Sequence, residues 1–99
     1  MENLNKYPVK SIHTASRVVD GEAVVVMPME SAINTFNEVG TRIWELADGT
    51  NTVTDIIHEI QQEFEVDAET AELDTREFLN ELVEKNMITL NDEAVKSKT

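Results

Sequence analysis

The sequence predicts an α+β domain of winged helix-turn-helix type, in which a three-stranded antiparallel β-meander precedes three α-helices. Two changes of pattern indicate it. Strand-like runs flank an Asp20-Gly21 turn within residues 15–36, and apolar residues at helical spacing occupy residues 37–86. A chain of 99 residues fits one domain. We expect this domain to span residues 15–90, between an N-terminal segment over 1–14 and a frayed tail over 91–99.

The predicted meander begins with a hairpin. Residues 16–19 and 22–27 flank Asp20-Gly21, a dipeptide that readily takes the positive φ angles of a type I′ turn. Pro28 cannot donate a ladder hydrogen bond, so it should end the second strand. Ala32–Phe36 is the expected third strand, with alternate side chains on opposite faces. If this strand lies at the sheet edge, its unpaired N–H and C=O groups can accept an extended peptide.

Three helices are expected after the meander, each with a capping signal and an apolar stripe. The stripe of the third helix contains Ala71, Phe78, Leu79, Leu82 and Val83. A short extended piece over residues 87–90 should follow. The predicted cap and stop residues are, in chain order, Asn37, Asp48-Gly49, Thr52 with Asp55, Asp67 or Thr70, and Asn86.

The net charge of −12 falls mostly within residues 37–86. Carboxylates on the predicted second and third helices oppose the phosphate contacts that drive DNA binding, so we expect no nucleic-acid partner. The charge either keeps a solvated helical surface soluble or attracts a basic partner. No run of residues is apolar enough to cross a membrane, and the N-terminus lacks a signal peptide, so we expect a cytoplasmic protein without a membrane partner.

Catalytic and cofactor-binding patterns are missing from the sequence. The chain has no cysteine, and His13 and His58 lie in different predicted parts. Three isolated glycines form neither a phosphate loop nor a dinucleotide fingerprint. No serine follows an aspartate at a helix start, which argues against a carrier protein. We therefore expect no enzyme activity, no metal and no cofactor on this chain.

One leucine of the third helix lies off its apolar stripe. On a helical wheel, Leu73 shares the face opposite to the stripe with Arg76, Glu77, Asn80 and Glu84. A leucine among charged residues can be a contact point for a partner, although isolated exposed leucines are also common. Together with the predicted strand edge, it favours a peptide-binding module.

The helical half resembles a known family. Residues 36–49, FNEVGTRIWELADG, and residues 52–57, TVTDII, are similar to the PqqD family's L-N-E-x-[AG]-x-x-I-W-x-L-x-D-G and T-V-x-[ED]-I. Residues 74–88, DTREFLNELVEKNMI, are similar to its D-V-x-x-F-L-x-x-L-x-x-x-G-[LW]-[LIV]. Phe36 replaces the usual leucine and Asn86 the usual glycine, and both substitutions keep the physical role of the position.

The resemblance implies a recognition element for ribosomally synthesised, post-translationally modified peptides (RiPPs) or for pyrroloquinoline quinone (PQQ) biosynthesis. Such an adaptor binds the leader segment of a precursor peptide and presents it to a radical-SAM maturase or to a leader peptidase with a cyclase. The resemblance places the leader beside the third strand and against the third helix. The implied contact residues are Ala32, Ile33, Asn34, Thr35, Phe36, Leu73, Arg76, Glu77 and Asn80.

Three alternatives remain open from the sequence. The domain could have kept this fold as a structural or regulatory interaction domain without leader binding. It could be a monomer or a homodimer, because an unpaired strand edge can also pair with its own copy. The charge of the helical half leads to a further hypothesis, that the leader is lysine-rich.

Overall fold

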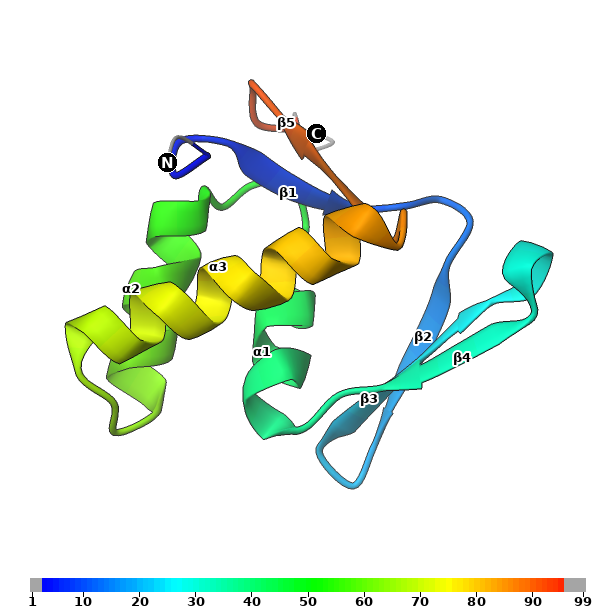
Figure 1. The fold of residues 1–99 in the computed structure, drawn as a ribbon, viewed down its shortest axis with the longest axis horizontal. Helices are drawn as coiled ribbons and strands as arrows, with labels where there is room; N and C mark the ends of the chain where they lie inside the picture. The colour runs from blue at the N-terminus through cyan, green and yellow to red at the C-terminus, as the bar shows by residue number, and fades with distance from the viewer. Residues whose placement is uncertain (1–2, 96–99) are drawn as a thin grey trace, which may run out of the picture.

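The computed structural model describes residues 3–95, and its elements follow the predicted order of a meander and then three helices (Figure 1). The α+β prediction is confirmed. The elements are β1 (Tyr7–Lys10), β2 (Ala15–Val19), β3 (Glu22–Met27), the 3₁₀ turn η1 (Pro28–Glu30), β4 (Ala32–Thr35), α1 (Glu38–Leu46), α2 (Val53–Glu63), α3 (Ala68–Glu84) and β5 (Ile88–Asn91).

The meander has the order β2-β3-β4, with both pairs antiparallel. Its first turn is the expected one, since Asp20 and Gly21 both have positive φ, 53° and 82°. The third strand ends at Thr35, one residue earlier than predicted. The Phe36 N–H still donates to the Ala23 carbonyl at 2.9 Å. The Thr41 hydroxyl takes the place of the second backbone hydrogen bond between these two residues. It accepts from the Ala23 N–H at 2.7 Å and donates to the Phe36 carbonyl at 3.2 Å.

Side-chain caps start all three helices. Asn37 accepts a hydrogen bond from the Gly40 N–H, and Thr52 and Asp55 form the predicted reciprocal capping box. Of the two candidates for α3, Asp67 is the cap, because its carboxylate accepts from the backbone N–H of Thr70 at 2.7 Å. After α3, Asn86 has a φ of 62°, the left-handed conformation that ends a helix.

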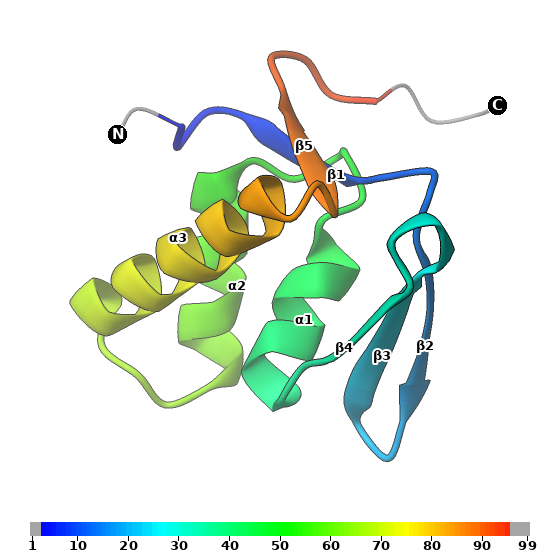
Figure 2. The ribbon, with the colours of Figure 1, turned by 45° about the vertical axis from the view of Figure 1, so that its right-hand side comes forward.

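A second sheet joins the two ends of the chain. β1, which lies within the N-terminal segment 1–14, pairs antiparallel with β5 (Figure 2). Just before β1, the carbonyl of Leu4 accepts from the Thr54 N–H at 3.1 Å, and the carbonyl of Lys6 accepts from the Val53 N–H at 3.0 Å. The N-terminal segment therefore satisfies two of the N–H groups that the first turn of α2 leaves free.

The residues after β5 fold back onto the body of the domain. The Val95 N–H donates to the Gly49 carbonyl at 2.8 Å, so the predicted frayed tail is packed at least to this residue. Its last part, 96–99, lies outside the described residues. Within residues 3–95, no helix has the length and apolar character that crossing a membrane requires.

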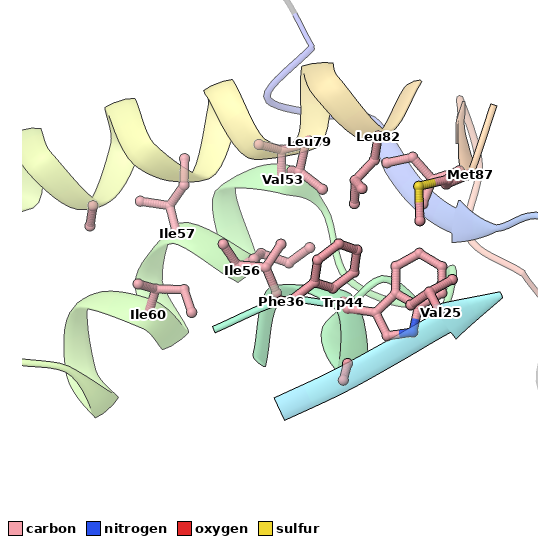
Figure 3. Packing of buried hydrophobic residues seen from close by; sticks show 14 of the residues in the cluster. Val25, Phe36, Trp44, Val53, Ile56, Ile57, Ile60, Leu79, Leu82 and Met87 are labelled. Atoms are coloured by element: carbon pink, nitrogen blue, oxygen red, sulfur yellow. The ribbon is translucent and has the colours of Figure 1, made fainter. Parts of the chain in front are cut away.

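The core lies between the three helices and the inner face of the meander (Figure 3). Trp44 lies at the centre of this core and is 2% exposed. Its indole N–H donates to the Ser16 hydroxyl of β2 at 3.1 Å. The α3 stripe differs from the prediction, since Thr75 is fully buried and Phe78 is only half-buried. Phe78 lies partly in the open because its ring lines the groove described below.

Candidate peptide-binding site

β4 is an edge strand whose backbone can still form a ladder. The hydrogen bond between Phe36 and Ala23 sets which residues of the antiparallel β3–β4 pair exchange backbone hydrogen bonds, since hydrogen-bonded and non-hydrogen-bonded pairs alternate. The N–H and C=O groups of Asn34 therefore point toward β3. The N–H and C=O groups of the intervening residues, Ile33 and Thr35, therefore point away from β3. Among the described residues, no strand pairs with this side of β4. Two successive outward-facing residues thus offer the hydrogen-bonding pattern that an added strand needs.

A groove of about 530 Å³ lies between β4, the start of α1 and α3. Its lining residues are Asn34, Thr35, Phe36, Asn37, Val39, Gly40, Ile43, Asp74, Glu77, Phe78, Glu81 and Lys85. The floor is apolar, with the rings of Phe36 and Phe78 packed edge to face at 4.9 Å between centroids. At Gly40, a Cβ atom would come within 3.1 Å of the Phe78 ring and 3.2 Å of the Phe36 Cβ, so the glycine lets α1 approach both side chains.

The α3 wall of the groove is acidic. Asp74, Glu77 and Glu81 are exposed along it, and none of them has an ion-pair partner among residues 3–95. Lys85 closes the end of the wall nearest β4, where its ammonium group lies 3.5 Å from the Asn34 side-chain oxygen. The groove therefore combines a free strand edge, an apolar floor, three carboxylates and one terminal cation.

The structure brings only part of the predicted site together. Asn34, Thr35, Phe36 and Glu77 line the groove. Ala32 is half-buried and precedes them on β4, while Ile33 is 71% exposed and faces the other side of the sheet.

Three predicted α3 residues lie elsewhere. Arg76 and Asn80 line a separate pocket of about 140 Å³ beneath the N-terminal segment, and Arg76 pairs with Glu72 at 3.1 Å. Leu73 is 57% exposed and lines neither this pocket nor the groove. The groove face of α3 is therefore rotated toward Asp74, Phe78 and Glu81, which the helical wheel did not single out.

A second apolar hollow lies beyond the start of β4. It measures about 480 Å³ and is lined by Ser11, His13, Met27, Met29, Glu30, Asn86, Ile88 and Thr89. It adjoins the Lys85 end of the groove through Asn86. Its lining contains one imidazole and one carboxylate, and no group of three metal-ligating side chains occurs anywhere in residues 3–95.

Lys10 is a half-buried titratable group outside the groove, and its role is structural. Its ammonium lies 5.2 Å from the Trp44 ring centroid and donates to the Ala47 carbonyl at the end of α1. Burial lowers the pKa of Lys10, and the nearby carboxylates of Asp48 and Glu45 oppose that effect. Lys10 does not line the β4–α3 groove. Its positive charge lies at the C-terminal end of α1, where it stabilises the helix.

The fold and the groove define a winged-helix-type α+β domain with an open strand edge beside an amphipathic helix. Residues 22–88 match the family "Coenzyme PQQ synthesis protein D (PqqD)", and the chain belongs to this family. No curated protein sequence matches the chain.

Two solved structures share the fold. The chain is similar to TbiB1 in complex with the TbiA(beta) leader peptide, with 30% identity and a TM-score of 0.75, covering 81% of this chain and 93% of TbiB1. It is also similar in fold to a lasso peptide synthetase B1 complexed with its leader peptide, with 17% identity and a TM-score of 0.75, covering 84% of this chain and 98% of the other.

Proposed function

We propose that this protein is a non-catalytic adaptor that binds the leader segment of a ribosomally synthesised precursor peptide and presents it to a modifying enzyme. The observation that carries the proposal is the outward-facing backbone of Ile33 and Thr35 beside the groove. Membership of the PqqD family and the similarity to the leader-bound TbiB1 support it.

The leader would add to β4 as a fourth strand of the meander. Its backbone would pair with Ile33 and Thr35, and alternate side chains would point inward onto Phe36 and the α3 wall. Ala32, Asn34 and Glu77 would complete the contact surface. Leu73, Arg76 and Asn80 belong to the proposed site only if the leader also crosses the outer side of α3.

The partner enzyme, the cellular location and the oligomeric state belong to the same proposal. The modifying enzyme would be a radical-SAM maturase or a leader peptidase with a cyclase, and the adaptor would act with it in the cytoplasm. The adaptor itself would contribute no cofactor. It would act as a monomer or a homodimer, since the β2 edge leaves the meander a second place to pair.

The test uses a random library of displayed peptides of roughly 15 residues, long enough to span the groove as a strand. Peptides that bind are then titrated into isotope-labelled protein. We expect amide shifts concentrated at β4 and at the groove face of α3. Shifts confined to other surfaces, or no selected binder, would contradict the proposal and favour an interaction domain that does not bind leaders.

A matched pair of proline variants tests strand addition. Thr35→Pro removes an outward N–H from the β4 edge, and Val18→Pro removes one from the β2 edge of the same sheet. Thermal unfolding first identifies the temperature at which both variants are folded. We expect Thr35→Pro to weaken binding at least tenfold, about 1.4 kcal/mol, and Val18→Pro to leave it unchanged. Equal effects would place the peptide away from β4.

A further inference from the structure

The groove has a charge pattern that constrains what an added strand can carry. Its three wall carboxylates belong to α3, and the floor beneath them is apolar. A side chain that points inward from a strand on β4 therefore meets aromatic carbon first and a carboxylate beyond it. Lysine and arginine fit such a surface, because their stems pack on apolar groups while their charged ends reach past them.

The spacing of the wall matches the repeat of a strand. Glu77 and Glu81 are four residues apart on α3, which places them about 6 Å apart along the helix axis. Inward-facing side chains of a strand recur every second residue, about 6.8 Å apart. In two views α3 and β4 run in roughly opposite directions, so a strand added to β4 also runs along α3 (Figures 1 and 2).

The carboxylates are free to take a new partner. The ion pairs that the structure describes on α3 and its neighbours use other acidic residues, Glu72, Glu45 and Glu63. Lys85 lies beyond Glu81 at one end of the wall, where it would repel a third cation at the next inward position. The favourable stretch for basic side chains is therefore limited to the part of the wall facing Glu77 and Glu81.

We infer that the groove selects leaders with two basic residues separated by one residue, whose inward side chains face Glu77 and Glu81. This inference rests on the proposed function and adds the class of leader that the site takes. A leader with acidic residues at both positions would bury like charges side by side and would be excluded.

The test repeats the peptide selection with two charge-reversal variants of equal net charge. The groove variant is Glu77→Lys/Glu81→Lys. The control variant is Glu69→Lys/Glu84→Lys, which changes two exposed residues of the same helix that do not line the groove. We expect the unmodified protein and the control to enrich a basic-x-basic pattern, and the groove variant to enrich an acidic-x-acidic one.

A titration with one selected basic-x-basic peptide gives the magnitude. We expect the groove variant to bind at least tenfold more weakly than the control variant, with a difference that shrinks at high salt. Enriched peptides that need the β4 edge but lack basic residues at these positions would overturn the inference and leave the proposed function standing. Equal loss in both variants would overturn it too, because it would assign the effect to overall charge.

Discussion

At the scale of single residues, two buried threonines have opposite effects on the stability of the fold. Thr41 is 5% exposed, and its hydroxyl both accepts from Ala23 and donates to Phe36, so it continues the β3–β4 ladder where the strand ends. Thr75 is 0% exposed in the middle of α3, and its hydroxyl has no hydrogen-bond partner among the described residues. A buried hydroxyl stabilises the fold only when it is paired.

Thr75→Val should therefore raise the free energy of unfolding by about 1 kcal/mol, because it removes an unpaired polar group and keeps the shape of the side chain. The matched change, Thr41→Val, should lower the same quantity by about 1–3 kcal/mol, since it leaves the buried Ala23 N–H without an acceptor. Urea unfolding followed by circular dichroism measures both. A loss of stability in Thr75→Val would show that its hydroxyl is paired in solution.

Leu73 provides a residue-scale test of where the peptide lies on α3. Leu73→Ala should change the affinity for a selected peptide less than about twofold, because the side chain is exposed and does not line the β4–α3 groove. Val39→Ala, on the groove floor, should weaken binding about fivefold or more. Isothermal titration gives both constants. A large loss in Leu73→Ala would extend the site across the outer face of α3.

At the scale of elements, the sequence predicts the features that depend on interactions between residues close together in the chain. The caps at Asn37 and Thr52 act within four residues, so their roles could be identified from the sequence. β1 could not be predicted in this way. It has four residues, contains Pro8, and pairs with a strand some eighty positions later in the chain. Proline cannot donate to a ladder and occurs in strands mainly at sheet edges, so Pro8 weakens the local strand signal of so short a run.

Part of the groove lining comes from a strand that the sequence predicts. The sequence left open whether this strand lies at a sheet edge; the structure places it there, and Asn34, Thr35 and Phe36 line the groove beside it. A helical wheel separates buried from exposed positions, but it does not show on which side of the helix the sheet lies. The groove therefore lies along Asp74 and Glu81, whereas the wheel singled out the face that carries Leu73.

The α1–α2 contact should depend on pH. Arg42 donates to both carboxylate oxygens of Glu63, at 2.8 and 3.1 Å, and this hydrogen bonding holds the pKa of Glu63 below its ordinary value of 4.5. A lowered folded-state pKa means that the stabilisation is fully present above pH 4.5 and is lost as the pH falls through the folded-state value. Both side chains are about one-third exposed, so the pair should contribute only about 0.5 kcal/mol.

Glu63→Gln tests this dependence. The unmodified protein should exceed the variant in free energy of unfolding at pH 7, and the difference should disappear in acid, because a protonated Glu63 resembles glutamine. Glu65→Gln is the control, since Glu65 is exposed and forms no ion pair within the described part of the chain. A Glu63→Gln difference that stays constant down to acid pH would assign the effect to packing.

At the scale of the whole molecule, the terminal sheet and the proposed peptide-binding groove lie in different parts. The two ends of the chain meet in the β1–β5 sheet, and the N-terminal segment supplies carbonyls to the first turn of α2. The groove uses β4, α1 and α3, and no residue of β1 or β5 lines it. The proposed adaptor can therefore change its groove side chains while its terminal sheet keeps the helices in place.

Removal of residues 1–10 separates these two roles. The shortened chain loses the β1–β5 ladder and the hydrogen bonds from Val53 and Thr54 to the N-terminal segment, so its free energy of unfolding should fall by about 2–4 kcal/mol. At a temperature where circular dichroism shows that it is folded, its affinity for a groove-binding peptide should stay within about twofold of the full chain. A larger loss of affinity in the folded, shortened chain would mean that the N-terminal segment positions α3 for recognition, because β1 itself does not reach the groove.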